Sequence, residues 1–319
     1  MIRFLLLVCY TVLLSGCQPA PSEFQTITTD AVYNAELSRD GKYLIISTAN
    51  NGVQLWDTNK KVKKYQWVHG KSGQANDVID AAISPNAQYA ATLNKDSLVV
   101  WDIQTGKSVG WWSLPATARS VAISNNGHVL VGLVDASVMS LSIVQNKLIQ
   151  FLGHQEKINS VSISANGTLA LSGGNGGKVI LWETQTGQPL HQWQLSSRIT
   201  KVLLSDDGKL SFAADITGDA NIWHSGNAGV VGKLNIKRRQ ISFSAAKFVN
   251  NDTQILTGTP AREVMLWQID SGKLDKKWHV QLTKNTKNKG AVVYSVAMRQ
   301  PDKVMSISSK GLLEIFSTQ

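Results

Sequence analysis

The sequence predicts an all-β fold built from repeated four-stranded units, because three series of residues recur in step along the chain. In the first series, apolar runs end at residues 56, 101, 141, 182, 223, 267 and 316, with spacings of 40 to 49 residues. In the second, a turn rich in Ser, Asn, Asp and Gly precedes the second strand of each unit. In the third, a Trp follows the end of an apolar run by eleven residues in four of the units. Seven copies of one unit make the 319 residues one large domain rather than two ordinary ones.

The clearest unit lies at residues 153–193. Apolar residues alternate with polar ones through 158–163, which is the period of a half-buried strand. A turn containing Asn and Gly separates this segment from a second strand at 168–172. A glycine-rich turn leads to a third apolar strand at 179–183, and a last strand ends at Trp193. The unit therefore predicts four short antiparallel strands.

This unit resembles a WD repeat. Gly153 and His154 begin it, a Ser-Ala-Asn-Gly turn follows, and Val-Ile-Leu-Trp-Glu stands where the family has an apolar run ending in Trp-Asp. Repeats of this family stack as blades of a β-propeller, since one four-stranded sheet cannot bury both of its faces alone. The resemblance implies a seven-bladed β-propeller of four-stranded antiparallel blades over residues 24–319. It also implies that His154 forms a structural hydrogen bond within its blade.

Tryptophans occupy two positions in the repeat, and we interpret both as core rather than as a ligand platform. The end of the third strand carries a structural Trp in five units, at Trp56, Trp101, Trp182, Trp223 and Trp267. The fourth strand carries a second aromatic eleven residues later, at Trp67, Trp112, Trp193 and Trp278, with Leu152 and Leu234 at the equivalent places in units three and five. We expect this second series to fill the space between adjacent blades.

The two ends of the domain predict how the ring closes. The seventh repeat holds three strands, within 292–316, and then the chain stops. Residues 24–29 form an extended segment that has no unit of its own. By resemblance to the family, this N-terminal strand completes the last blade and so removes exposed sheet edges.

The first 17 residues predict a bacterial lipoprotein signal peptide, and residues 18–23 a short tether. Arg3 precedes an apolar run at 4–14 that is too short to span a bilayer, and the following Leu-Ser-Gly-Cys resembles a lipobox. Cys17 would then be lipidated and become the mature N-terminus; the alternative is an ordinary secretory signal with an incidental cysteine. Gln18, in place of the aspartate that retains such lipoproteins in the inner membrane, favours the outer membrane facing the periplasm.

This location decides how the charge is interpreted. A net charge of +10 and a pI near 9.5 are typical of proteins that bind nucleic acid or anionic surfaces, but a cell-envelope location argues against nucleic acid. In the family, the loops between blades and those between second and third strands lie on one face, the top. The richest basic segments there are Lys237, Arg238 and Arg239, and Lys284, Lys287 and Lys289. They predict a surface for a periplasmic or outer-membrane partner protein; the alternative is that these charges only maintain solubility.

The motifs of common active sites are absent from the sequence. Six histidines show no pair spacing typical of a metal site, and the glycine-rich 173–178 lacks the Ser or Thr and the helix of a phosphate-binding loop. We therefore expect no cofactor, no metal and no catalytic residue. The prediction is a monomeric, non-catalytic, lipid-anchored protein–protein interaction scaffold in the bacterial cell envelope, with support of envelope-protein assembly as one role. The alternative is a propeller enzyme, or a sensor of a small anionic ligand, with its site at the mouth of the central channel.

Overall fold

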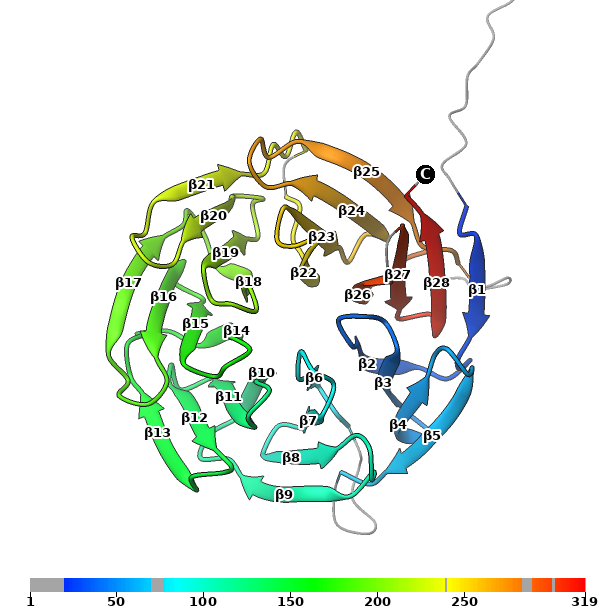
Figure 1. The fold of residues 1–319 in the computed structure, drawn as a ribbon, viewed down its shortest axis with the longest axis horizontal. Coiled ribbons are helices and arrows are strands. Elements are labelled where there is room, and N and C mark those ends of the chain that lie inside the picture. The colour runs from blue at the N-terminus through cyan, green and yellow to red at the C-terminus, as the bar shows by residue number, and fades with distance from the viewer. Residues whose placement is uncertain (1–19, 70–76, 239, 283–288, 300–301, 319) are drawn as a thin grey trace, which may run out of the picture.

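The structure is a computed structural model, and it describes residues 20–69, 77–238, 240–282, 289–299 and 302–318. Its 28 strands form seven four-stranded antiparallel sheets, arranged as blades around a central axis (Figure 1). The predicted all-β, seven-bladed propeller is confirmed. In the described part of the chain, no helix is long and apolar enough to cross a membrane.

Within each blade, the strands are counted from the innermost one outward. Blade 1 holds β2 to β5, and blade 7 holds β26, β27, β28 and β1. The innermost strands, which line the axis, are β2 (Val32–Leu37), β6 (Asp80–Ile83), β10 (Ala118–Ile123), β14 (Ile158–Ile163), β18 (Ile199–Leu204), β22 (Ala245–Val249) and β26 (Val293–Arg299). The second strands are β3 (Tyr43–Thr48), β7 (Tyr89–Leu93), β11 (His128–Leu133), β15 (Leu169–Gly174), β19 (Leu210–Asp215), β23 (Gln254–Gly258) and β27 (Lys303–Ser308).

The outer two strands of each blade carry the tryptophan series. The third strands are β4 (Gly52–Asp57), β8 (Ser97–Asp102), β12 (Val138–Ser142), β16 (Lys178–Glu183), β20 (Ala220–His224), β24 (Glu263–Gln268) and β28 (Leu312–Ser317). The outermost strands are β5 (Val62–Trp67), β9 (Ser108–Ser113), β13 (Lys147–Phe151), β17 (Pro189–Gln194), β21 (Val230–Lys233), β25 (Leu274–His279) and β1 (Glu23–Thr26). Second and third strands are the most deeply buried of the four, because sheets pack against both of their faces.

The N-terminal strand closes the ring as predicted. β1 pairs antiparallel with β28, so that Glu23 lies opposite Ile315 and Thr26 opposite Leu312. Just before the strand, the Ser22 amide donates to the Ile315 carbonyl at 2.8 Å. Figure 1 shows β1 and β28 side by side at opposite ends of the colour scale. The outer edge of blade 7 is therefore supplied by the start of the domain.

Outer-strand aromatics lie between the blades, where they stack on the third-strand residue of the next blade. The stacked pairs are Trp67 on Trp101 at 4.8 Å between ring centroids, Phe151 on Trp182 at 4.3 Å, and Trp193 on Trp223 at 4.7 Å. Trp278 meets Phe316 at 5.9 Å, in a tilted arrangement. Each pair joins a blade to its neighbour, so these contacts tie consecutive units into one core.

Blade 3 departs from the expected register. Leu152 was expected in the space between blades, but it is 73% exposed, and Phe151 fills that space instead. In blades 1, 2, 4, 5 and 6 a β-bulge lies opposite the Trp near the end of the third strand, which we call the marker Trp, and adds one residue to the outermost strand. β12 and β13 pair without such a bulge, so the interblade position comes one residue earlier.

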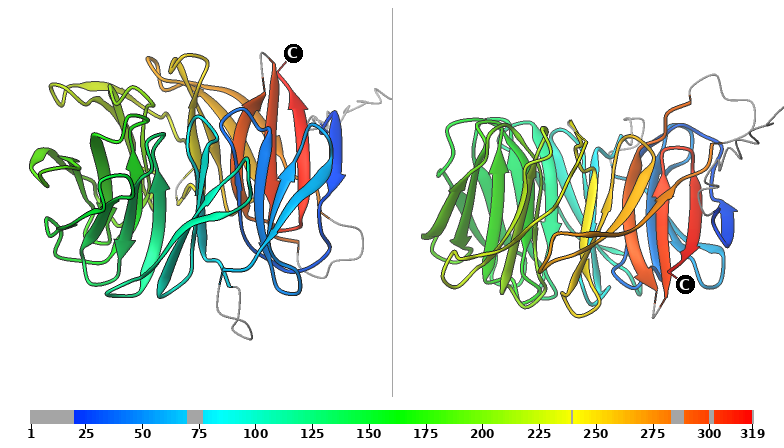
Figure 2. Two further views of the ribbon diagram at one scale, coloured as in Figure 1. Left: turned by 60° about the horizontal axis from the view of Figure 1, so that its bottom comes forward. Right: turned by 90° about the horizontal axis from the view of Figure 1, so that it is seen from above.

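The two faces of the ring carry different connections, and Figure 2 shows them as the rims of a flat disc. We call top face the one that holds the connections between blades and the turns between second and third strands. The other, the bottom face, holds the turns between first and second strands and those between third and fourth strands. β28 is the third strand of blade 7, so it ends at the bottom face. Glu23 lies opposite Ile315, near this end, and the chain therefore enters the ring at the bottom face. Cys17 and the signal peptide lie outside the described residues.

Candidate functional site

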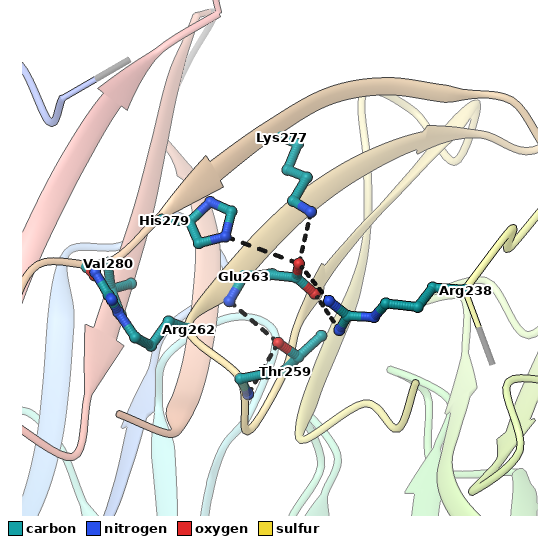
Figure 3. Close-up of polar contacts among 8 residues, drawn as sticks. Arg238, Thr259, Arg262, Glu263, Lys277, His279 and Val280 are labelled. Atoms are coloured by element: carbon teal, nitrogen blue, oxygen red, sulfur yellow. Dashed lines mark hydrogen bonds and ion pairs between the residues drawn. The ribbon is translucent and has the colours of Figure 1, made fainter. Parts of the chain in front are cut away.

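A buried carboxylate organises the basic residues on the top face of blade 6. Glu263 begins β24, and only 3% of its side chain is exposed. The Arg238 guanidinium donates to both carboxylate oxygens, at 3.2 and 3.0 Å. Lys277 Nζ donates to Oε1 at 2.5 Å, and His279 Nε2 lies 3.8 Å from the same oxygen (Figure 3). One negative charge thus holds two cations in place.

Strand pairing brings these residues together. Glu263 lies directly opposite His279 in the β24–β25 ladder, and Lys277 precedes His279 by two positions on the same face of the strand. Arg238 reaches the carboxylate from the connection between β21 and β22, in the preceding blade. The Glu263 amide donates to Thr259 Oγ1 at 3.1 Å, which fixes the start of the strand (Figure 3). The cluster is therefore built on rigid elements rather than on a free loop.

A third cation, Arg262, borders the cluster without touching the carboxylate. Its Nε and Nη2 donate to the Val280 carbonyl, at 3.1 and 2.8 Å, and its backbone has a φ of 72°. Burial lowers the pKa of His279 from its usual value, and the nearby Lys277 lowers it further. His279 is therefore neutral at pH 7. Arg238, Lys277 and Arg262 outnumber Glu263, so the site keeps a net positive charge.

Charge on the described part of the top face is divided between two sectors. Cations dominate blades 5 to 7 and the connections that lead into them, at Arg198, Lys233, Lys237, Arg238, Arg262, Lys277, Lys289 and Lys310, against Asp215, Asp219 and Glu263. Acids outnumber bases on blades 1 to 3, at Asp30, Asp77, Asp96 and Asp135, against Lys95 and Arg119. The described cations of the top face therefore gather on blades 5 to 7, which we call the basic sector.

The predicted binding residues have different positions in the structure. Arg238 belongs to the Glu263 cluster, while Lys237 and Lys289 are exposed nearby in the basic sector. Arg239, Lys284 and Lys287 lie outside the described residues. Sequence reasoning did not connect Lys277 or His279 with the top face. The signal that could have found them is their spacing around Trp278, since the repeat fixes which residue lies opposite Glu263.

The predicted structural residues lie inside the blades or between them. Trp101, Trp182, Trp223 and Trp267 are buried, with at most 6% of each exposed, whereas Trp56 and Trp193 are half-buried. His154 Nε2 lies 2.8 Å from Ser172 Oγ, which also accepts a hydrogen bond from Trp182 Nε1 at 3.2 Å. This is the within-blade bond that the resemblance implied for His154. Trp56 instead donates to Gln54 Oε1 of its own strand, at 2.8 Å.

A second polar site lies on the axis of the ring. The innermost strands enclose a cavity of about 210 Å³ whose charged lining includes Glu36, Asp80, Lys201 and Lys247. Glu36 and Lys247 form an ion pair at 2.8 Å. Carboxylates and amines are thus balanced here, in contrast to the basic sector. This charge balance does not favour an anionic ligand in the channel.

Two buried histidines make hydrogen bonds within their own blades. His128 and His154 each contact a serine hydroxyl within a blade, at 2.8 Å in both cases, away from the axis. No group of three or more His, Cys, Asp or Glu in the described ranges is arranged to hold a metal ion.

Comparison with known proteins agrees with this architecture. The family model described as "WD domain, G-beta repeat" matches residues 145–183, the repeat that also has the clearest sequence pattern. An autophagy-related protein 16 from Arabidopsis thaliana is 21% identical over 70% of this chain and 45% of its own length. A guanine nucleotide-binding protein subunit beta from Oryza sativa subsp. japonica is 26% identical over 53% of this chain and 50% of its own. The eukaryotic translation initiation factor 3 subunit I from Candida glabrata is 27% identical over 48% of each chain.

The chain thus spans about half the length of the curated relatives it matches. The matched repeat and the seven blades of the structure together support a WD-repeat β-propeller.

Proposed function

We propose that this protein is a non-catalytic interaction scaffold that binds an acidic partner protein through the basic sector of its top face. The observation that carries the proposal is the Glu263 cluster, in which one buried carboxylate holds Arg238 and Lys277 at the surface. Arg238 remains 57% exposed and Lys277 37% exposed, so both can still reach a partner. Two of the similar proteins are named as subunits, which is consistent with a role in protein assemblies.

Pre-ordering is what distinguishes this cluster from ordinary surface charges. A flexible Arg or Lys loses about 0.5–1.5 kcal/mol of side-chain entropy when a partner immobilises it. Here much of that cost is already met in the free protein, because Glu263 fixes the two side chains. The excess positive charge then accelerates encounter with an acidic surface and fixes its orientation.

We further propose that the scaffold is anchored in the bacterial cell envelope through lipidated Cys17, in the outer membrane and facing the periplasm, where it supports envelope-protein assembly. The chain enters the ring at the bottom face, at Glu23, and the basic sector lies on the opposite face. Because Ser22 already bonds to β28, only residues 18–21 separate Cys17 from the ring, and they span at most about 15 Å. Anchoring from below would hold the propeller close to the membrane and leave the basic sector accessible.

Charge reversal in the basic sector tests partner binding. The double variant Lys237→Glu/Lys289→Glu changes two exposed residues and leaves the Glu263 cluster intact. Crosslinking in bacterial envelopes, followed by mass spectrometry, should recover a partner with the wild-type protein and lose it with this variant. Arg119→Glu, an exposed reversal on blade 3, outside the basic sector, is the matched control and should keep the partner. Equal recovery by all three proteins would contradict the proposed surface.

Lipid anchoring has an independent test. Cells fed an alkyne-labelled fatty acid should label the wild-type protein, and the label should disappear in Cys17→Ser. Membrane fractionation should place the labelled protein with the outer membrane. A wild-type protein that takes up no label, or that is recovered with the inner membrane, would rule out this part of the proposal while leaving the partner surface to its own experiment.

A further inference from the structure

The central cavity contains polar groups that the propeller fold does not need for its own closure. Innermost strands have one free backbone edge, and in several blades a side chain of the preceding blade satisfies it. The Val121 amide donates to Asp80 Oδ2 at 2.8 Å, and the Val202 amide donates to Ser160 Oγ at 3.1 Å. A serine hydroxyl accepts the equivalent hydrogen bond from Val202, so the fold does not require a carboxylate at Asp80.

The charged groups of the cavity are only partly paired with one another. Lys247 forms its ion pair with Glu36 at 2.8 Å and also donates to the Leu37 carbonyl, so this pair is internally satisfied. Lys201 and Asp80, in contrast, form no direct ion pair within the described residues. Their charges attract each other across the cavity. Burial raises the pKa of Asp80 to about 6, and Lys201 opposes this rise. An amine and a carboxylate therefore face the same space from blades 5 and 2.

One acceptor in the cavity lining lacks a hydrogen-bond donor in the part of the chain that the structure describes. Asn34 Oδ1 is buried and receives no hydrogen bond from these residues. Asn34 lies on β2, in the blade next to Asp80, and both residues line the cavity. A buried, unsatisfied acceptor costs about 1–3 kcal/mol. Blade 1 thus presents an acceptor that lacks a donor, blade 2 presents the Asp80 carboxylate, and blade 5 presents the Lys201 amine.

A second set of charges spans the channel at its bottom face. Arg39, in the turn after β2, forms ion pairs with Asp206 of blade 5 and, at 3.4 Å, with Asp252 of blade 6. These contacts cross the axis at the bottom face, where Arg39 and Asp206 also line the cavity.

We infer that this cavity binds a small zwitterion, such as a free α-amino acid. Its ammonium group would donate to Asn34 Oδ1 and Asp80, and its carboxylate would accept from Lys201. Such a ligand supplies the missing donor at one wall and the missing acceptor at the other, and it leaves the cavity electrically neutral. A purely anionic or cationic ligand would satisfy one wall and leave the opposite charge unpaired in a buried site. The inference does not depend on the proposed partner surface.

Isothermal titration of the wild-type protein, from Ala20 onward, with glycine, L-alanine, L-serine and L-glutamate tests this directly. At least one amino acid should bind, and the analogues that lack one feature should bind about tenfold more weakly or not at all. These analogues are trimethylglycine, which has no N–H donor, n-propylamine, which has no carboxylate, and propionate, which has no ammonium. Absence of heat with all four amino acids at millimolar concentration would overturn the inference, as would equal binding of propionate.

Two variants locate the site. Asn34→Leu removes the unpaired acceptor, and Lys201→Met removes the amine while keeping its apolar stem; each should weaken amino-acid binding about tenfold or more. Lys289→Met removes a cation in the basic sector and should leave binding unchanged. Melting temperatures of all variants separate loss of the site from loss of the fold. Undiminished binding by folded Asn34→Leu and Lys201→Met would place the ligand elsewhere and contradict the inference.

Discussion

Buried histidines show how single residues couple this fold to pH. His154 contacts Ser172 Oγ at 2.8 Å, and in blade 2 His69 contacts Thr92 Oγ1 at 2.7 Å. In both blades the hydroxyl also accepts the indole N–H of the marker Trp. Burial lowers the pKa of His154 and of His69 to about 4. Both rings are therefore neutral in the folded protein at pH values where they are protonated in the unfolded chain.

We expect His154 to destabilise the protein in mild acid. Because its folded pKa of about 4 lies below its unfolded value of 6.5, the stability it contributes is complete above pH 6.5 and is lost as the pH falls toward 4. At pH 5 the loss is about 2 kcal/mol relative to pH 7.5. Urea unfolding of the wild-type protein and of His154→Gln at both pH values checks this. The variant should lose less stability on acidification, and parallel losses would contradict the assignment.

Glu314 has the opposite pH dependence. It is buried on β28 and accepts the Gln281 amide at 2.9 Å through one oxygen. Among the described residues, its Oε2 has no partner, and neither has Oγ of Ser306, which lies opposite it. Ser306 holds the place of Ser172, but Phe316 replaces the marker Trp and has no N–H to donate. Burial raises the pKa of Glu314 to about 7.

Replacing Glu314 with Gln should therefore stabilise the protein above neutrality. A carboxyl whose folded pKa is raised above 4.5 contributes most at low pH, and this contribution is lost as the pH rises through about 7. Glu314→Gln should gain about 3 kcal/mol over the wild type at pH 8.5 and almost nothing at pH 4.5. Guanidinium unfolding at the two pH values measures the difference. A gain that does not change with pH would show that Glu314 does not titrate in this range.

At the scale of elements, the joint between blades is set by a bulge and an aromatic pair. The bulge at the marker Trp decides which outer-strand residue turns inward, as the contrast between Trp193 and Phe151 shows. The depth of that residue varies around the ring. Trp278 is 1% exposed and belongs to the core shared by blades 6 and 7, whereas Trp193 is only half-buried.

Truncation of these two tryptophans should therefore have unequal effects. Trp278→Ala leaves a large cavity between blades and should cost about 3–5 kcal/mol of unfolding free energy. Trp193→Ala removes its stack on Trp223 but less buried area, and should cost about 2 kcal/mol. Chemical denaturation of both variants gives the comparison. Equal losses would mean that exposure does not govern the strength of the interblade joint.

The repeat period made most strands predictable from the sequence. The predictions that were wrong or missing concern single residues, and each has a local structural cause. Spacing alone located the blades because each unit must bury the same faces against its neighbours. It misplaced Leu152 because the absence of a bulge in blade 3 depends on pairing geometry that the sequence does not display. The basic segment at Arg238 was recognisable, whereas its counter-ion was not. Glu263 lies 25 residues away and meets Arg238 only when blades 5 and 6 pack together.

At the scale of the whole molecule, stability depends on closure by β1. Without this strand, β28 would expose an unpaired edge and part of the core at the joint of blades 7 and 1. A protein that begins at Ile27 should melt at a lower temperature and self-associate, whereas one that begins at Ser22 should behave as the wild type. Thermal unfolding and size-exclusion chromatography distinguish them. A monomeric, equally stable protein beginning at Ile27 would contradict this role of β1.

The same closure has a consequence for how the chain matures. The Ser22 hydroxyl donates to the Ile315 carbonyl at 3.0 Å across 293 positions of sequence, so β1 finds its partner only after blade 7 has been made. Contacts this distant in sequence form slowly. If the N-terminus is exported first, β1 remains a bare, pairing-competent strand throughout translocation, and crowded chains could exchange it with one another. An anchor at Cys17 would keep each β1 beside its own emerging chain and so favour self-closure over strand exchange between neighbours.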